Sequence, residues 1–322
     1  MNKDILNTLL DANDFVSGQE LSDKLGVTRT TICNNIKEIR KAGFEVESVT
    51  NKGYKITQKT KNINAVLIER NLKTKTLGRT IYETEETPST NTYLKQASLE
   101  GCPDGALAVT HLQTAGKGRL GRVWKTEKDS SAIMSYILMP EISPKDIAAV
   151  TQVVGLAVCR TLNRLYDIGC EIKWPNDIIC KNKKLCGILC EMSAELDRVN
   201  YIIPGIGINC DQESFPEEIA HKATSIYLET GEHPDKNLIV AEILNETEKI
   251  LLTTGFAFDR PLIEEYTSLC ATIGRQVQFY RDGNQMSGAA VAITGDGELV
   301  VETEGHLSFL INSGEVTVQG IY

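Results

Sequence analysis

The chain has 322 residues and a formal net charge of −9 at pH 7, with 41% hydrophobic and 24% charged residues. This length and composition predict two or three domains of an ordinary soluble globular protein. The sequence holds no apolar run near ~20 residues, and its first residues are too acidic for a signal peptide. We therefore expect a cytoplasmic protein with no membrane partner, and the acidic balance argues against a protein that coats nucleic acid.

Nine cysteines are scattered along the chain, mostly inside apolar strings, and none forms a C-x-x-C pair. The sequence therefore supports neither a zinc ribbon nor a disulfide framework. We expect buried, reduced thiols, as in a cytoplasmic protein, and no metal site built from protein side chains alone.

Residues 1–61 predict a small helical domain. Apolar residues recur at helical spacing over residues 5–10. Ser17 and Glu20 have the S-x-x-E spacing of a capping box that opens a short second helix, and Thr28 caps a third helix. One face of the third helix carries isoleucines at i, i+4 and i+7, which are Ile32, Ile36 and Ile39.

Two short strands, residues 44–49 and 54–56, follow around a glycine-containing turn. Helix, turn, helix and basic-tipped hairpin is the order of a winged helix-turn-helix. The segment holds ten Lys and Arg against eight Asp and Glu, a net of +2, so the rest of the chain carries −11. Nucleic-acid contact is expected here, through polar side chains that bind phosphates and base edges. The predicted DNA-binding residues are Ser17, Arg29, Thr30, Thr31, Asn34, Asn35, Lys37 and Lys52. A small protein-binding module is the alternative.

After a polar linker at 58–64, strands and helices mix as far as residue 271. The predicted strands are 80–84, 106–109, 132–138, 171–174, 178–181, 185–192 and 199–208, and the predicted helices are 91–100, 143–166, 236–252 and 260–269. The close succession of four strands implies antiparallel neighbours and an α+β domain. Residues 272–322 show short alternating runs broken by turns at 282–283, 295–297 and 313–314, which predict a small β-barrel.

The stretch QTAGKGRLGRVW, residues 113–124, contains a G-x-G-x-x-G pattern. A Rossmann phosphate turn must run directly into a helix, and the residues that follow show no helical apolar stripe. A P-loop is excluded as well, because no Gly-Lys-Ser/Thr closes the pattern. What remains is a glycine backbone that carries Lys117, Arg119 and Arg122 and could close over an anionic ligand. A solvated basic hairpin is the alternative.

Four further motifs carry functional groups. Residues 89–91, Ser-Thr-Asn, begin a helix after a proline, and KWPND, residues 173–177, ends a strand. Lys184 follows a hairpin turn with Gly187 three residues on, and the stretch PGIGIN, residues 204–209, places glycines inside a strand, which often marks a close approach. Taken singly, each has a structural explanation: a helix cap, a turn or a solvated lysine.

Together, in this order, these motifs resemble the biotin–protein ligase family and, with the N-terminal segment, its bifunctional members that also repress biotin genes. The resemblance covers essentially the whole chain. It implies an N-terminal winged helix-turn-helix (1–61), a central mixed-sheet α+β catalytic domain of the class II synthetase-like type (62–271) and a C-terminal SH3-like β-barrel (272–322). It also implies ATP-dependent formation of biotinyl-5'-AMP and transfer of biotin to a lysine of a biotin carboxyl carrier domain.

The resemblance assigns roles to residues. Catalysis falls to Lys184, Arg119 and Asp177. Biotin binding falls to Ser89, Thr90, Asn91, Gln113, Lys117, Gly118, Arg119, Lys184 and Gly187. ATP and adenylate binding falls to Arg119, Arg122, Trp124, Lys173, Asn176 and Asn209, and Trp174 joins Trp124 in lining apolar faces. Lys117 stands where the family often has arginine, which keeps the charge but loses the planar fork.

The same resemblance implies Mg²⁺ accompanying ATP, and biotinyl-5'-AMP acting as co-repressor. The liganded protein is expected to form a homodimer on operator DNA. Three other hypotheses remain: a lipoate or octanoate ligase of related fold, a transcription factor that binds biotin without catalysis, and a ligase whose N-terminal segment contacts protein.

Overall fold

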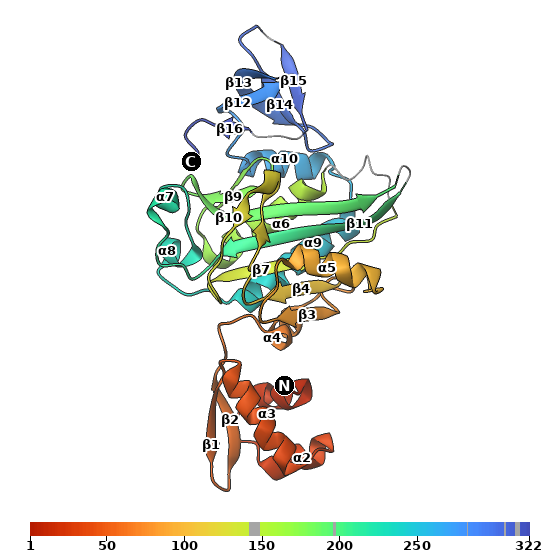
Figure 1. The fold of residues 1–322 in the computed structure, drawn as a ribbon, viewed down its shortest axis with the longest axis vertical. Coiled ribbons are helices and arrows are strands. Elements are labelled where there is room, and N and C mark those ends of the chain that lie inside the picture. Colours follow the sequence, from red (N-terminus) through yellow and green to blue (C-terminus); the bar gives the residue numbers. More distant parts are fainter. Residues whose placement is uncertain (142–148, 196–197, 282, 306, 313–315) are drawn as a thin grey trace.

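Three bodies are stacked along the long axis of the molecule in the computed structural model (Figure 1). The structure describes residues 1–141, 149–195, 198–281, 283–305, 307–312 and 316–322. The N-terminal helices and hairpin form one end, a large sheet with its helices forms the middle, and a small sheet forms the other end. The C-terminus returns to the junction between the small sheet and the middle body.

The N-terminal body is the predicted winged helix-turn-helix. Its elements are α1 (Lys3–Asp11), α2 (Gly18–Leu25), α3 (Arg29–Lys41), β1 (Glu45–Val49) and β2 (Gly53–Gln58). The predicted caps are confirmed: the Ser17 hydroxyl accepts the Glu20 N–H at 3.0 Å, and the Thr28 hydroxyl accepts the Thr31 N–H at 3.2 Å. Gly26 ends α2 at φ +65°, the left-handed geometry that glycine adopts without strain.

The middle body contains a seven-stranded mixed sheet in the order β3-β4-β7-β11-β10-β9-β8. Its strands are β3 (Ile81–Thr84), β4 (Leu107–Thr110), β7 (Ser131–Tyr136), β8 (Glu171–Lys173), β9 (Asp177–Cys180), β10 (Lys183–Ala194) and β11 (Val199–Asn209). The predicted antiparallel succession from β8 to β11 is confirmed, and only β3 and β4 pair in parallel. The two-stranded hairpin of β5 (Gly116–Lys117) and β6 (Val123–Trp124) stands apart from this sheet.

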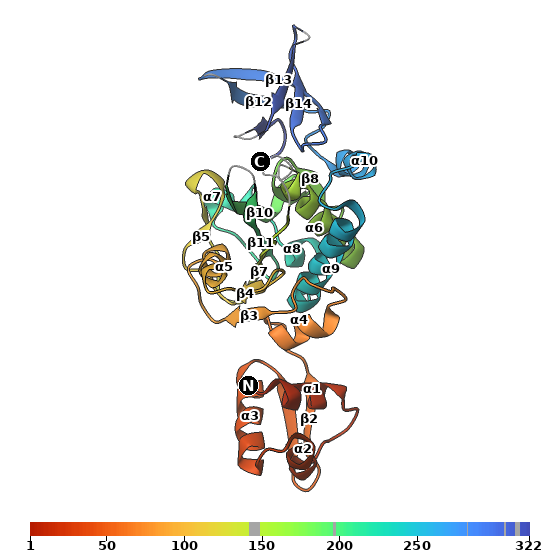
Figure 2. The same ribbon diagram turned by 90° about the vertical axis from the view of Figure 1, so that its right-hand side faces the viewer.

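Helices cover both faces of the large sheet (Figure 2). One face carries α5 (Thr90–Leu99), and the other carries α6 (Val150–Tyr166) and α9 (Lys236–Thr254), with α10 (Arg260–Leu269) beside α6. Residues 143–148 of the predicted helix 143–166 lie outside the described residues. The sequence did not predict the three short helices α4 (Ala65–Asn71), α7 (Glu217–Ala220) and α8 (Ile226–Thr230).

The predicted linker at 58–64 is held by side chains of the middle body. The backbone N–H of Asn64 donates to Asn237 Oδ1 at 2.7 Å, and that of Ala65 donates to Glu83 Oε2 at 2.6 Å. The segment therefore enters the middle body along a fixed path, which its polar composition did not indicate.

Helix α4 joins the two bodies. Val66 and Leu67 pack into the core of the winged helix, whereas Ile68 packs into the core under the large sheet. Two ion pairs between α1 and α4 add to this junction, Lys3–Glu69 and Arg70–Asp11.

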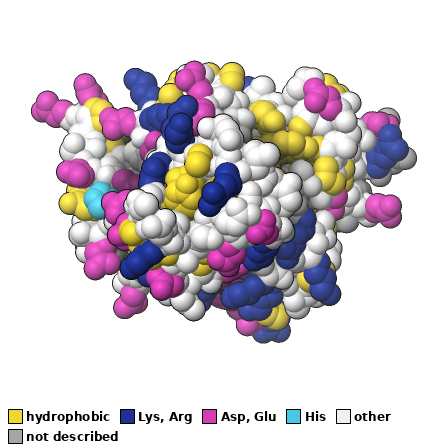
Figure 3. Space-filling view, turned by 90° about the horizontal axis from the view of Figure 1, so that it is seen from below, with side chains coloured by type: hydrophobic (Ala, Val, Ile, Leu, Met, Phe, Trp, Pro, Cys, Tyr) yellow, Lys and Arg dark blue, Asp and Glu magenta, His cyan; other side chains and the backbone are white. Residues whose placement is uncertain are grey.

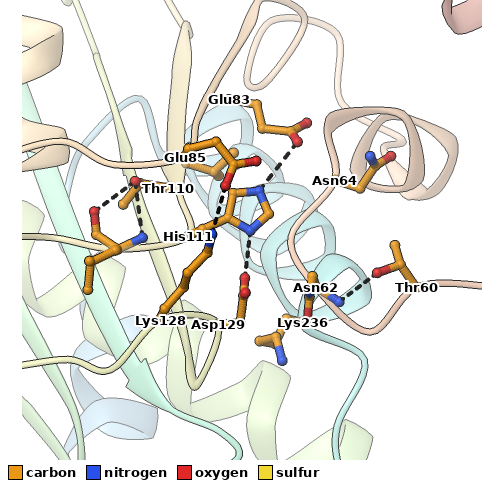
Figure 4. A network of polar contacts seen from close by, with 12 residues as sticks. Thr60, Asn62, Asn64, Glu83, Glu85, Thr110, His111, Lys128, Asp129 and Lys236 are labelled. Atoms are coloured by element: carbon orange, nitrogen blue, oxygen red, sulfur yellow. Dashed lines mark hydrogen bonds and ion pairs between the residues drawn. The ribbon is translucent and has the colours of Figure 1, made fainter. Parts of the chain in front are cut away.

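A buried histidine lies beside the same junction (Figure 4). His111 stands between Asp129, whose Oδ1 is 2.6 Å from Nδ1, and Glu83, whose Oε1 is 3.5 Å from Nε2. Glu83 and then Asp129 raise the pKa of His111 to about 9, although burial opposes the shift. An imidazolium at neutral pH therefore bridges two carboxylates, one of which also holds the Ala65 N–H.

The C-terminal body is a five-stranded antiparallel sheet in the order β15-β14-β13-β12-β16. Its strands are β12 (Gln276–Arg281), β13 (Asn284–Ile293), β14 (Leu299–Glu302), β15 (Ser308–Ile311) and β16 (Thr317–Val318). Its apolar residues share one core with the middle body. The predicted turn at 295–297 is present, with Gly297 at φ +77°, whereas residues 282, 313 and 314 of the other predicted turns lie outside the described residues.

Two composition-based predictions can be compared with the structure. All nine cysteines are free, and seven are buried. Cys33 on α3 is exposed, which corrects the expectation for that residue, and Cys190 is half-buried. Among the described residues, no helix is long and apolar enough to cross a bilayer.

Candidate active site and nucleic-acid interface

The glycine-rich loop folds as a hairpin. Strands β5 and β6 pair through Gly116 with Trp124, and the Gly118 N–H donates to the Arg122 carbonyl at 2.7 Å. A short 3₁₀ turn, Arg119–Gly121, forms the tip. The chain continues into β6 and then β7, and no helix follows the glycines, so the exclusion of a Rossmann turn is confirmed.

This hairpin covers a cavity of about 650 Å³. The opposite walls come from the start of α6, from Pro175 and Asn176, and from residues 188–191 of β10. Asn312 of the C-terminal body also lines the cavity. The cavity therefore lies where the loop, the large sheet and the small sheet meet.

The Ser-Thr-Asn motif lies at the start of α5. Ser89 occupies the N-cap position and is buried, but its hydroxyl makes no capping bond to the described backbone of that helix. The Thr90 N–H and hydroxyl both donate to Gln113 Oε1, at 2.9 and 3.3 Å. The structure thus brings together two residues that are 23 positions apart, and it leaves the Ser89 hydroxyl free of the capping role that was the alternative for this motif.

Asn91 is bound on all sides by protein groups. Its Oδ1 accepts from the Ser135 hydroxyl at 2.6 Å, and its Nδ2 donates to Glu191 Oε2 at 2.8 Å. Glu191 in turn pairs with Lys95 at 2.5 Å. A Cβ on Gly205 would lie 2.2 Å from Asn91 Oδ1, so this strand glycine makes room for a side chain. These contacts favour a supporting position for Asn91 behind the cavity wall.

Trp124 packs flat against two other strand glycines. A Cβ on Gly207 would lie 2.7 Å from the Trp124 ring, and one on Gly187 would lie 3.1 Å from it. The close approach that the glycines predicted is therefore made by an indole. The indole N–H is buried and makes no hydrogen bond to any described residue, which leaves a polar atom available beside the cavity.

Lys184 and Asp177 form an ion pair on neighbouring strands. Lys184 Nζ lies 2.7 Å from Asp177 Oδ1 and 5.6 Å from the Trp124 ring centre. Asp177 faces Gly187 in the β9–β10 register, and a Cβ on Gly187 would lie 3.2 Å from Lys184 Cε, so the glycine makes room for the Lys184 and Trp124 side chains. The lysine is only partly exposed, and its charge therefore acts in a less screened environment than a surface lysine's.

Tyr322 of the C-terminal body contacts the Lys184–Asp177 ion pair. Its hydroxyl donates to Asp177 Oδ2 at 2.5 Å, and the Lys173 ammonium lies 3.7 Å from the ring centre. Burial lowers the pKa of Lys173 to about 8, against the opposing effect of Asp177. Sequence reasoning missed Tyr322, because no local pattern distinguishes it from the terminal residue of a small domain.

Arg119 lies half-buried at the hairpin tip. Its Nη1 donates to Asn176 Oδ1 at 3.0 Å, and Asn176 Nδ2 donates to the Ile188 carbonyl at 2.8 Å. Burial lowers the pKa of Arg119, which nevertheless remains a cation. Arg122 and Lys117 are exposed and also line the cavity, and Lys117 Nζ reaches the Thr92 hydroxyl at 3.3 Å.

Five of the assigned residues line the cavity, namely Lys117, Gly118, Arg119, Arg122 and Asn176, and the others are not part of its described lining. Trp174 is 1% exposed, and its indole N–H donates to the Gly297 carbonyl at 2.9 Å, so the expectation that it lines an apolar face of the site is wrong. Its ring instead joins the middle and C-terminal bodies. Asn209 is buried at the end of β11, where its Nδ2 donates to the Thr224 carbonyl at 3.0 Å. Residues 222 and 224 in turn bond to the backbone of Lys184, so Asn209 supports the strand that carries the lysine.

A protein-held metal site is not apparent. Within the ranges that the structure describes, no group of three or more His, Cys, Asp or Glu side chains could hold a metal ion. The Asp177 carboxylate faces Lys184 and accepts from Tyr322, and the Glu191 carboxylate, which lines the cavity, is paired with Lys95.

The predicted DNA-reading residues divide into two groups. Four lie exposed on α3: Arg29, Thr30, Asn34 and Lys37. Lys52 is exposed at the hairpin turn. Seen from this end of the molecule, Lys and Arg side chains are interspersed with Asp and Glu (Figure 3). Any contact with nucleic acid is therefore made by individually placed groups, as the modest net charge indicates.

The second group, Ser17, Thr31 and Asn35, makes hydrogen bonds within the winged-helix domain. Ser17 caps α2, and Thr31 shares a hydrogen bond of 2.9 Å with the Thr28 hydroxyl. Asn35 Oδ1 accepts the Asn2 N–H at 2.5 Å, and its Nδ2 donates to the Thr31 carbonyl. Thr31 and Asn35 hold α3 in place and Ser17 holds α2, and a direct contact with DNA would have to compete with those bonds.

Three parts of the chain match known protein families. Residues 2–55 match the HTH domain, residues 83–209 match the biotin/lipoate A/B protein ligase family, and residues 272–318 match the biotin protein ligase C terminal domain.

Similar proteins cover nearly the whole chain. It is 36% identical over 310 residues to the bifunctional ligase/repressor BirA of Bacillus spizizenii, covering 94% of each chain. It is 27% identical over 300 residues to the protein of the same name in Escherichia coli, covering 93% of this chain and 92% of that one. Among solved structures, the biotin protein ligase from Aquifex aeolicus in complex with biotin and ATP aligns with a TM-score of 0.63 and 28% identity, over 75% of this chain and 99% of the other.

Proposed function

The chain belongs to the family of bifunctional biotin ligase/repressor proteins, and from this premise we propose how its residues carry out the two activities. The ligase activity joins biotin to ATP and passes the biotinyl group to a lysine of a biotin carboxyl carrier domain. The observation that carries this proposal is the cavity under the basic hairpin, which Lys117, Arg119, Arg122 and Asn176 line. Lys184 meets the same hairpin at the Trp124 ring, and Thr90 holds Gln113 just before the hairpin begins.

Biotin is bound by the polar side chains at the start of α5 and by Gln113. The ureido ring of biotin needs fixed donors and acceptors, and the hydroxyl of Ser89 and the amide of Gln113 supply both kinds. Thr90 holds Gln113 by two hydrogen bonds, so the amide is oriented before the ligand arrives. Asn91 supports these groups from behind, and Gly187 lets Trp124 and Lys184 lie close to β10 beside the ligand.

Adenylation brings two anions together. A carboxylate oxygen of biotin attacks the α-phosphorus of ATP, pyrophosphate leaves, and a mixed anhydride remains. Arg119 and Lys184 neutralise the carboxylate and the α-phosphate, while Lys173 and Arg122 attract the departing phosphates. The backbone of residues 117–119 closes over the product, Trp124 lies against its apolar part, and Asn176 keeps Arg119 in position.

Transfer needs a carrier amine at the acyl carbon. The amine attacks, AMP leaves, and the amide of biotinyl-lysine forms. Asp177 was a candidate to orient or to deprotonate that amine. Since Oδ2 accepts the Tyr322 hydroxyl and Oδ1 faces the Lys184 ammonium at 2.7 Å, although without a hydrogen bond to any described residue, we assign it the orienting role. When bound with ATP, Mg²⁺ would neutralise part of the triphosphate charge, beside the cations Arg119, Lys184 and Lys173 of this chain.

The repressor activity uses the winged helix. Biotinyl-5'-AMP acts as co-repressor, the liganded chains pair as a homodimer, and two copies of α3 contact a palindromic operator. Arg29, Thr30, Asn34 and Lys37 face the base edges and phosphates, with Lys52 on a neighbouring phosphate. Residues 1–61 form the DNA-binding domain, 62–271 the catalytic domain and 272–322 the C-terminal domain. Because the protein acts on ATP and on operator DNA, we place it in the cytoplasm.

Two assays test this proposal. Purified protein should incorporate labelled pyrophosphate into ATP only when biotin is present, and should transfer biotin to a purified carrier domain. Lipoate in place of biotin serves as the competing substrate. Exchange that follows lipoate and not biotin would contradict the proposed substrate, and biotin binding without any exchange would reduce the protein to a biotin sensor.

A further inference from the structure

The segment at 319–322 runs from the small sheet into the catalytic centre. The Gln319 N–H donates to the Gln276 carbonyl at 3.0 Å, and the Ile321 N–H donates to the Val318 carbonyl at 3.2 Å. The Ile321 side chain is buried in the core that the middle and C-terminal bodies share. Tyr322 is therefore delivered to Asp177 along an anchored path.

The phenol of Tyr322 completes the coordination of Asp177. One carboxylate oxygen, Oδ1, faces Lys184 at 2.7 Å, and the other, Oδ2, accepts the Tyr322 hydroxyl at 2.5 Å. Burial, followed by the Asp177 charge, raises the pKa of Tyr322, so the phenol stays protonated and donates. Oδ1 accepts no hydrogen bond from a described residue, so the Tyr322 hydroxyl is the group that restricts rotation of the carboxylate and sets the direction of its pull on the Lys184 ammonium.

The ring has a second contact. The Lys173 ammonium lies over it at 3.7 Å, which holds the cation by its charge against the π-face and removes it from water. Four groups therefore face Lys173: the Tyr322 ring, Asp177, Lys184 and Arg122.

We propose that Tyr322 is a positioning residue of the adenylation centre, through which the C-terminal sheet fixes Asp177 against Lys184 and holds Lys173 over the phosphates. This rests on the proposed ligase function, and it makes the small sheet part of the catalytic apparatus. The hydroxyl acts through Asp177, whereas the ring acts on Lys173, so the two parts of the side chain can be tested separately.

The hydroxyl is tested by Tyr322→Phe in biotin-dependent pyrophosphate exchange. Its loss should lower kcat roughly fivefold to tenfold with little change in the KM for biotin, since one hydrogen bond to a charged group is removed. In an Asp177→Asn background the same change should have no further effect, because the two residues act in series. Tyr280→Phe is the matched control, as Tyr280 is an exposed tyrosine on β12 of the same sheet.

The ring is tested by Tyr322→Ala through the pH profile. In the wild type, kcat/KM for ATP should fall as pH rises through about 8, where Lys173 loses its charge. With the ring gone, Lys173 regains water, its pKa rises, and the decline should move to higher pH. Tyr322→Phe keeps the ring and should keep the wild-type decline.

Failure of the Tyr322 role and failure of the proposed ligase function would give different results. An active wild type with an unchanged kcat in Tyr322→Phe, or losses that add in the Asp177→Asn background, would overturn the positioning role. A Tyr322→Ala profile with the wild-type decline would overturn the role of the ring. A wild type that catalyses no biotin-dependent exchange would overturn the proposed function, and this inference with it.

Discussion

The two terminal bodies are joined to the catalytic domain in different ways. The winged helix has its own core and meets the middle body through the short helix α4 and surface ion pairs. The small sheet shares the core of the middle body, bonds to Trp174 and sends Tyr322 to Asp177. The first arrangement suits a domain that reads DNA as a unit, and the second makes the C-terminal sheet inseparable from catalysis.

The largest effect should come from the centre where the bodies meet. Lys184→Ala removes the cation that faces both carboxylate and phosphate, so the single-turnover rate of adenylation should fall by about 10²–10³-fold. Lys183→Ala, one position earlier on β10, is the control and should retain the wild-type rate. An unchanged rate in Lys184→Ala would remove the lysine from its assigned role.

A smaller loss should isolate the winged helix. Arg29→Ala should weaken operator binding by about 1–3 kcal/mol, roughly ten- to a hundredfold, because a side chain able to contact a base or phosphate is lost. Biotin transfer should stay at the wild-type rate, since α3 is remote from the cavity. Gel shifts at two salt concentrations, with Arg260→Ala as the control for lost charge, measure this. A matching loss of ligase activity would contradict the view that the winged helix acts separately from the catalytic domain.

The histidine beside α4 should give the junction a pH-dependent stability. His111→Gln should lower the free energy of unfolding by about 1.5–3 kcal/mol, because charged hydrogen bonds to Glu83 and Asp129 are lost. The folded pKa is raised to about 9, so the stabilisation is fully present below pH 6.5 and is lost as pH rises through 9.

Urea unfolding at pH 6 and pH 9.5 measures this difference. The variant should differ most from the wild type at the lower pH. His233→Gln, which loses a more exposed pairing with Asp211, is the matched control. A difference that is largest at pH 9.5 would contradict the bridging role of the imidazolium.

The smallest effect concerns the hairpin. Lys117→Arg should slow dissociation of biotinyl-5'-AMP by less than about tenfold, because the guanidinium can form two parallel bonds where the ammonium forms one. Stopped-flow release of the adenylate measures the rate. Faster release in the variant would show that the lysine serves its contact with Thr92 and not the ligand.

Features governed by neighbouring residues could be predicted from the sequence. The caps at Ser17 and Thr28 and the isoleucine stripe of α3 depend on spacing within a turn or two, and each is present. The antiparallel strands from β8 to β11 followed from their short connections. The glycine motif also indicated part of the cavity lining, namely Lys117, Gly118, Arg119 and Arg122, and the KWPND motif indicated Asn176.

Contacts between distant residues could not be predicted. Tyr322 and Asp177 are 145 positions apart, and Ala65 meets Glu83 only because the sheet brings β3 to the start of α4. Trp174 shows the opposite error, since its place in a functional motif suggested the cavity while its apolar ring lies in the core. Sequence alone does not tell which side of a strand a motif residue occupies when both sides are covered.

Operator binding by the winged helix is proposed to depend on the biotinyl-5'-AMP that the middle body makes. Lys184→Ala protein, given biotin and ATP, should fail to protect operator DNA in a footprint, and saturating synthetic biotinyl-5'-AMP should restore protection. Full protection by the variant with biotin and ATP, or none with the synthetic adenylate, would contradict the account.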